Sequence, residues 1–258
     1  MKNIWAIYRK EVGLYFVSPI AYAVIGIFLI LAGFFFSRIL DFFIQQSFML
    51  MMRASQFGMP PQEFDVPGQV MQSFFGVVST MILFFIPMLT MGSYAEEKKR
   101  GTMELLMTSP LTDSQIVWGK FLATLTLFII MLAPTLLYIV ALYRYSDPRP
   151  PLAVAASGYL GVLLLGATLI AVGHFISSLT ESQVVAAFLT FGAFLILWVI
   201  DAGSRGSQVL EYLSILRQFE NFPKGIIDTK SLVFYASFIV LGVFLTLRSV
   251  DSLRWRSA

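Results

Sequence analysis

The chain has 258 residues, of which 57% are hydrophobic and 13% are charged, and its mean hydropathy is +0.78. A soluble domain has no interior large enough for so much apolar surface, so this composition excludes an ordinary soluble protein and predicts a membrane protein. The net charge of +3 does not indicate nucleic-acid binding, because the basic residues are scattered at helix ends. The lack of cysteine excludes disulfides and thiolate metal sites, and the one histidine, His174, excludes a multi-histidine site.

Residues 3–16 are expected to form an amphipathic helix that lies on the membrane. Ile4, Tyr8 and Tyr15 share one face of this helix, and Glu11 falls inside the same apolar arc. Two interpretations of Glu11 are open. One is a carboxylate that snorkels at the edge of the face, which is the simpler account of a single misplaced charge. The other is a face that meets a protein with a basic partner.

Six apolar runs are each long enough to cross a hydrocarbon core of about 30 Å as helices. Pro87 falls inside the second run and Pro134 inside the third, and each is expected to kink its helix, because proline lacks the backbone N–H. We therefore predict an all-α polytopic membrane protein with a single transmembrane domain over residues 1–258. Its expected parts are an N-terminal helical segment at 1–18 and spans at about 20–40, 71–91, 116–142, 152–177, 183–200 and 231–247.

Two longer connections, residues 41–69 and 201–230, are expected on the outer side of the membrane. The first is rich in methionine, whose thioether binds Cu(I), although methionine is more often adaptable packing at a protein or lipid surface. We favour packing. The second is expected to contain an amphipathic interfacial helix over about 209–219. The methionines concerned are Met49, Met51, Met52, Met59 and Met71.

The densest charged interval, residues 93–115, connects the second span to the third and must lie outside the bilayer core. Within it, Thr102 can cap a helix that begins at Met103, while Gly101 and Pro110 bound that helix. Such a helix presents leucine and methionine beside charge and suits a docking contact, although an ordinary polar loop accounts equally well for the composition. The residues predicted to contribute to the contact are Glu96, Gly101, Thr102, Glu104, Leu105, Leu106, Met107 and Pro110.

Residues 161–168 have the glycine spacing of a phosphate-binding loop, but Ala167 stands where a lysine is required and the setting is a spanning helix. No other stretch offers such a loop, so we expect the chain not to bind or hydrolyse ATP. No span holds paired carboxylates, a Ser–His arrangement or a set of metal ligands, which argues against an intramembrane enzyme. We expect His174 to be a packed or capping residue, with no role as a ligand or proton relay.

The string EEKKRGTMELLMTSPLT at residues 96–112, followed by IVWGK at 116–120, resembles the coupling-helix region of ABC-2 type transporter permeases. The six-span layout and the segment around 219–228 match as well, so the resemblance covers nearly all of the chain. It is closest to the small permeases associated with gliding motility and with nitrous oxide reductase maturation. The resemblance implies a membrane subunit driven by a separate ATPase chain, which holds the short helix and carries ATP and magnesium. It also implies a homodimer or a heterodimer with a related permease.

With six spans, both termini lie on one side of the membrane, and a small majority of Lys and Arg residues assigns that side to the cytoplasm. The resemblance requires the same orientation, because ATP is cytoplasmic, and it implies a bacterial inner membrane. The spans contain almost no ionisable groups, so we expect export of a hydrophobic or amphipathic cargo, or force passed to an auxiliary protein on the outer side. The alternative function is a membrane scaffold or assembly factor without transport of its own.

Overall fold

The computed structural model describes residues 2–57, 65–147, 149–203 and 214–254. In these ranges every regular element is a helix, which confirms the all-α prediction. The elements in chain order are α1 (Lys2–Val17), α2 (Pro19–Gln56), α3 (Val66–Thr90), α4 (Gly92–Lys99), α5 (Thr102–Thr108), α6 (Asp113–Leu132), the 3-10 turn η1 (Ala133–Thr135), α7 (Leu136–Tyr145), α8 (Leu152–Leu179), α9 (Gln183–Gly203), the 3-10 turns η2 (Arg217–Phe219) and η3 (Phe222–Lys224), and α11 (Thr229–Arg254).

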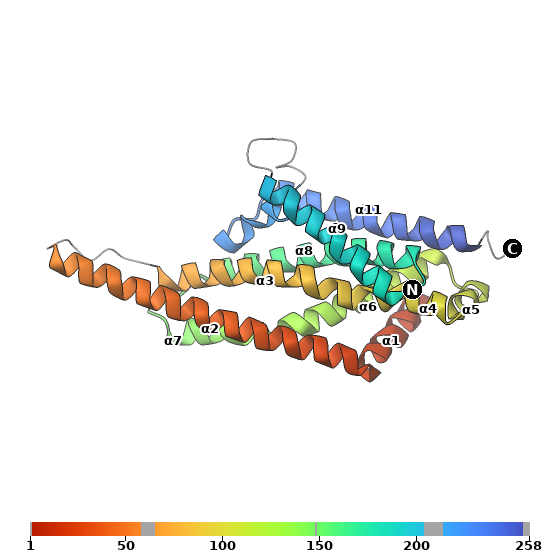
Figure 1. Cartoon of the computed structure of the whole chain (residues 1–258), viewed down its shortest axis with the longest axis horizontal. Coiled ribbons are helices and arrows are strands. Elements are labelled where there is room, and N and C mark those ends of the chain that lie inside the picture. Colours follow the sequence, from red (N-terminus) through yellow and green to blue (C-terminus); the bar gives the residue numbers. More distant parts are fainter. Residues whose placement is uncertain (1, 58–64, 148, 204–213, 255–258) are drawn as a thin grey trace.

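The long helices run side by side along the long axis of an elongated bundle (Figure 1). Within the described ranges, five stretches are long and apolar enough to cross a membrane, and α9 adds a shorter apolar helix, Gln183–Val199. The six predicted spans coincide with these helical stretches, although the third, 116–142, is interrupted by η1 and the second ends one residue beyond α3. The polytopic prediction is confirmed. The five long stretches are Pro19–Gln56, Val66–Lys99, Asp113–Tyr145, Leu152–Leu179 and Thr229–Ser252.

The first spanning helix is much longer than its predicted span. Residues 41–56 continue α2 without a break, and the end of that helix projects past its neighbours (Figure 1). The methionines assigned to the first outer connection consequently lie in different environments. Met71 is buried in the core, Met49, Met51 and Met52 are exposed on α2, and Met59 lies outside the described residues.

The two internal prolines lie close to interruptions of their helices. Pro134 lies in η1, between α6 and α7. Beyond Pro87, the chain leaves α3 at Met91, whose N–H still donates to the Pro87 carbonyl (2.9 Å). The Ser177 hydroxyl of α8 donates to the Met91 carbonyl (3.0 Å) and accepts from the backbone N–H of Tyr94 (3.2 Å). A neighbouring helix thus provides hydrogen bonds for the irregular backbone, as the interior of a membrane protein requires.

Helix α8 lies at the centre of the packing and contacts α3, α6, α9 and α11. Its glycines allow aromatic rings to approach its backbone closely. A Cβ atom at Gly158 would lie 2.2 Å from the Phe75 ring, and one at Gly166 would lie 2.2 Å from the Phe128 ring. Small residues on a spanning helix permit this close packing.

The segment after α9 differs from the predicted interfacial helix. Residues 209–213 lie outside the described part, and the residues that follow form a turn and η2, with no α-helix. Phe219 and Phe222 are buried, and the Ser157 hydroxyl of α8 donates to the Phe222 carbonyl (2.8 Å). For the described residues the predicted interfacial helix is wrong, because their apolar side chains pack inside the protein and do not lie on the membrane surface.

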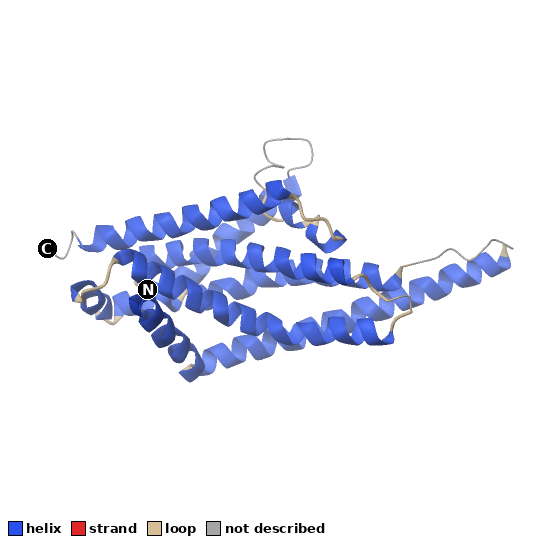
Figure 2. Cartoon of the chain, turned by 180° about the vertical axis from the view of Figure 1, so that it is seen from behind, coloured by secondary structure: helices blue, strands red, loops and turns tan. Residues whose placement is uncertain are grey.

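The two ends of the bundle carry different elements. Helices α4 and α5, the start of α1 and the end of α11 share one end in both views (Figures 1 and 2). The projecting tip of α2 lies at the opposite end. The predicted docking helix therefore lies at the same end of the bundle as the start of α1 and the end of α11.

Candidate functional site

The predicted short helix is present as α5, and it is bounded by the expected glycine and proline. Gly101 has φ of 68°, in the left-handed region that glycine adopts without steric cost. Thr102 is the first residue of the helix, so the prediction that it caps a helix starting one residue later is wrong. Its hydroxyl donates to the Glu97 carbonyl (3.3 Å). Pro110 is exposed just beyond the helix end.

The faces of α5 have distinct environments. Met103 is buried and packs into the core, which holds the helix against the bundle. Leu105 is 70% exposed, Glu104 is also exposed, and Leu106 is half-buried. The side chain of Met107 is not described. The helix therefore presents apolar area to the outside while its opposite face is anchored.

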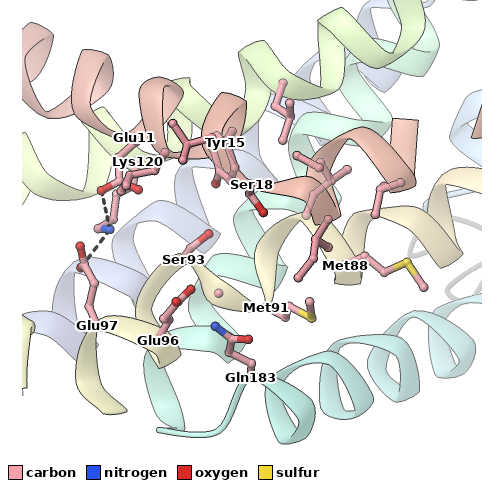
Figure 3. A pocket seen from close by; sticks show the side chains of 18 of the residues that line it. Glu11, Tyr15, Ser18, Met88, Met91, Ser93, Glu96, Glu97, Lys120 and Gln183 are labelled. Atoms are coloured by element: carbon pink, nitrogen blue, oxygen red, sulfur yellow. Dashed lines mark hydrogen bonds and ion pairs between the residues drawn. The ribbon is translucent and has the colours of Figure 1, made fainter. Parts of the chain in front are cut away.

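A cluster of paired charges lies where α1, α4 and α6 meet, and we call it the charge cluster: Lys10, Glu11, Glu97 and Lys120. Glu11, Glu97 and Lys120 are largely buried and are labelled in Figure 3, whereas the Lys10 side chain is 49% exposed. Lys120 Nζ lies 3.0 Å from Glu11 Oε1 and 2.9 Å from Glu97 Oε2, and its side chain is 2% exposed. Lys10 Nζ lies 3.1 Å from Glu97 Oε1. Charges this deeply buried are tolerated only when they are paired. The cluster therefore ties together α1, α4 and α6.

Helix α1 packs along the first part of α6. A Cβ atom at Gly119 would lie 2.7 Å from the Ile7 side chain, so the two helices are in close contact. The Tyr15 and Thr124 hydroxyls lie 2.9 Å apart, and burial raises the pKa of Tyr15, which stays protonated. Glu11 lies on this packed face. The interpretation of Glu11 as a snorkelling carboxylate is therefore wrong, and its basic partner belongs to the same chain.

His174 joins three helices next to the charge cluster. Its Nε2 lies 3.0 Å from the Thr124 hydroxyl of α6 and 3.3 Å from the Ser93 hydroxyl of α4. Its ring also packs edge-on against Tyr94, with ring centroids 5.6 Å apart. His174 is buried, which confirms the prediction of a packed residue.

The structure separates the two adjacent glutamates of the charged interval. Glu96, which the sequence assigned to the docking contact, pairs with Arg100 at the surface. Glu97, which it did not select, pairs with Lys120 in the interior. Lys120 could have been selected from the sequence, because an ionisable residue at the start of an apolar span is by default a candidate functional residue. Its partners were not predictable from spacing, since they lie on other helices.

Fold and site together define a polytopic helical membrane protein with a short exposed helix, braced by buried charges, at one end of its bundle. The sequence profile described as ABC-2 family transporter protein matches residues 59–223, which is more than half of the 258-residue chain. The chain belongs to this family and is a membrane permease subunit of an ABC transporter, with no catalytic role of its own. A comparison with curated proteins gave no match. The resemblance to the gliding-motility and nitrous-oxide-reductase-maturation permeases stays a prediction.

Proposed function

We propose that a separate ATPase chain, which carries ATP and magnesium, holds α5 and drives the spanning helices through it. The observation that carries this proposal is the exposure of Leu105 on a helix whose other side is anchored by Met103. Covering an exposed leucine in a cleft contributes about 1.5–3 kcal/mol. Glu104 and Glu96 lie near enough in sequence to pair with basic groups at the rim, where charge tunes fit and association rate.

The charge cluster offers a route from α5 to the spans. Helix α4 leads directly into α5, and Glu97 of α4 is bonded to Lys120 at the start of α6. On the other side of α4, Lys98 donates to the Ser178 carbonyl near the end of α8. A displacement of α5 would therefore act on α6 and α8 through polar contacts, because a buried ion pair resists separation.

We place the α5 end of the bundle on the cytoplasmic side of a bacterial inner membrane, because the ATPase must reach α5 from the compartment that contains ATP. Both termini then lie in the cytoplasm, and the tip of α2 lies on the outer side. We also propose two permease copies, or one copy with a related permease, because one six-helix subunit is small for a transport pathway.

We propose that the transporter exports a hydrophobic or amphipathic cargo. The alternative is that it moves no cargo and transmits force to an auxiliary protein on the outer side. Two ionisable groups inside the predicted spans, Lys120 and His174, support the choice of such a cargo. Lys120 is fully engaged by Glu11 and Glu97, and His174 is buried between helices. Neither is free to line a path for small hydrophilic solutes, which usually contains accessible ionisable groups.

The docking proposal is tested with a double variant, Leu105→Asp with Leu106→Asp. Both residues lie outside the predicted spans, so the chain should insert normally. The variant should lose the co-purifying ATPase, or keep it with ATP hydrolysis uncoupled from transport. The matched control is Ile226→Asp with Ile227→Asp, two adjacent exposed apolar residues in the segment before α11.

The control pair should retain the ATPase at the level of the parent chain. If the α5 pair also inserts, retains its ATPase and functions normally, the docking proposal fails. A chain that recruits no ATPase in any variant would instead favour the scaffold function.

A further inference from the structure

A cavity of about 600 Å³ lies beside the charge cluster, between the α1–α2 corner and the α3–α4 junction (Figure 3). This volume is typical of ligand sites, which measure about 300–1,000 Å³. The cavity is lined by residues of the six helices α1 to α6 and by Gln183, the first residue of α9. Its wall is divided by chemistry, and in Figure 3 the carboxylates and lysine lie on one side while Met88 lies on the other.

One side of the cavity is apolar and opens outward. Leu14, Val17, Ile20 and Met88 line it, and all four are exposed at the surface of the spanning bundle. Val17 is 80% exposed. These residues adjoin spanning helices and carry no polar group, so lipid chains are the solvent that suits them. The opening on this side therefore faces the hydrocarbon.

The other side of the cavity is charged and balanced. Its charged residues are Lys10, Arg100 and Lys120 on the positive side and Glu11, Glu96 and Glu97 on the negative side, so their formal charges cancel. The charge cluster uses four of these groups internally. The remaining two, Glu96 and Arg100, form an i,i+4 pair in which both members are partly or largely exposed. This pair can offer an acceptor and a donor to a ligand at the same time.

We propose that this cavity binds a zwitterionic phospholipid with a primary ammonium, taken from the leaflet on the α5 side. A ligand must be amphiphilic to satisfy both walls. Glu96 accepts from the ammonium, which has three donors, and Arg100 binds the phosphate, for which its planar guanidinium is well shaped. An anionic lipid would leave a net charge in a neutral site, and a quaternary ammonium has no hydrogen to donate. The site shares Glu96 and Thr102 with the residues predicted for the ATPase contact, but its test uses the purified chain without ATPase.

The test is native mass spectrometry of the purified full chain titrated with dioleoyl phosphatidylethanolamine, phosphatidylcholine and phosphatidylglycerol. The parent chain should hold one phosphatidylethanolamine more tightly than either other lipid. Arg100→Gln should weaken this binding about tenfold, because one charge-assisted contact is lost. The matched control is Arg248→Gln: Arg248 is as exposed as Arg100 (69% against 70%) and also pairs along its helix, with Asp251, but it does not line the cavity.

A second variant locates the lipid inside the cavity. Ala21 lines the apolar side, and Ala21→Phe should fill that space and weaken phosphatidylethanolamine binding while thermal unfolding stays unchanged. The proposal is overturned if the three lipids bind equally, if phosphatidylglycerol is preferred, or if Arg100→Gln and Arg248→Gln behave alike. It is also overturned if Ala21→Phe, correctly folded, binds the lipid as the parent does.

Discussion

The two ends of the bundle are held together by different forces. At the α5 end, buried ion pairs centred on Lys120 connect α1, α4 and α6. At the opposite end, Phe219 and Phe222 pack against α8, and the Tyr235 hydroxyl donates to the Ile215 carbonyl (2.8 Å). An ion pair is most favourable at short distances between particular charged atoms, whereas the contribution of apolar packing depends mainly on the apolar area removed from the solvent. Under the function proposed above, movement enters at the α5 end, where buried ion pairs resist separation.

The largest effect is expected where a buried charge loses its partner. Lys120→Met leaves Glu11 and Glu97 facing each other in the interior, and breaking such a pair costs about 3–5 kcal/mol. The free energy of unfolding in detergent, followed by tryptophan fluorescence, measures this loss. Lys224→Met is the same substitution at the other end, at an exposed lysine, and should change stability by about 0.5 kcal/mol or less. Equal effects would remove the contrast between the ends.

Apolar truncation should give the reverse pattern. Phe222→Ala removes a fully buried ring at the far end and should lower the free energy of unfolding by about 3–5 kcal/mol. Leu105→Ala removes an exposed side chain at the α5 end and should leave the stability of the isolated chain within about 0.5 kcal/mol. The same unfolding assay compares the two. A marked loss for Leu105→Ala would mean that α5 is held by its leucines and does not present them.

The adjacent glutamates sharpen the comparison within the α5 end. Glu97→Gln removes one charged partner of Lys120 and should destabilise the chain by about 1–3 kcal/mol. Glu96→Gln affects only a surface pair with Arg100 and should cost about 1 kcal/mol or less. The two variants differ by one position in the chain and share the same chemistry. Similar losses would show that burial of Glu97 contributes nothing to this joint.

The sequence predicted the parts of the fold that depend on local chemistry. Apolar runs located the spanning helices, and Gly101 with Pro110 bounded α5, because these features act through the backbone of their own segment. The sequence-based prediction was wrong where it had to decide whether an apolar face is covered by lipid or by protein. Both the face around Glu11 and the residues near Phe219 were assigned to the membrane surface, yet both pack on protein. An amphipathic pattern says which side chains avoid water but not whether lipid or protein covers them.

The charge cluster shows the same limit for polar residues. Lys120 was identifiable as an ionisable group at the start of a span, but its partners come from helices far away in the chain. The short interval of four charged residues before Arg100 gave no reason to separate Glu97 from Glu96. Only the side on which each points from α4 distinguishes them, and that depends on how α4 is docked against α1, α6 and α8.

The proposal most in need of a direct test is that a separate ATPase chain binds α5. The chain contains no cysteine, so a single introduced cysteine provides a unique attachment point. Leu105→Cys and Ile226→Cys place one at each end of the bundle, at residues that are both largely exposed. A short thiol-directed cross-linker is added to membranes that contain the partner ATPase. The account predicts a permease–ATPase product from Leu105→Cys and none from Ile226→Cys, while no product from Leu105→Cys, or equal products from both, would contradict it.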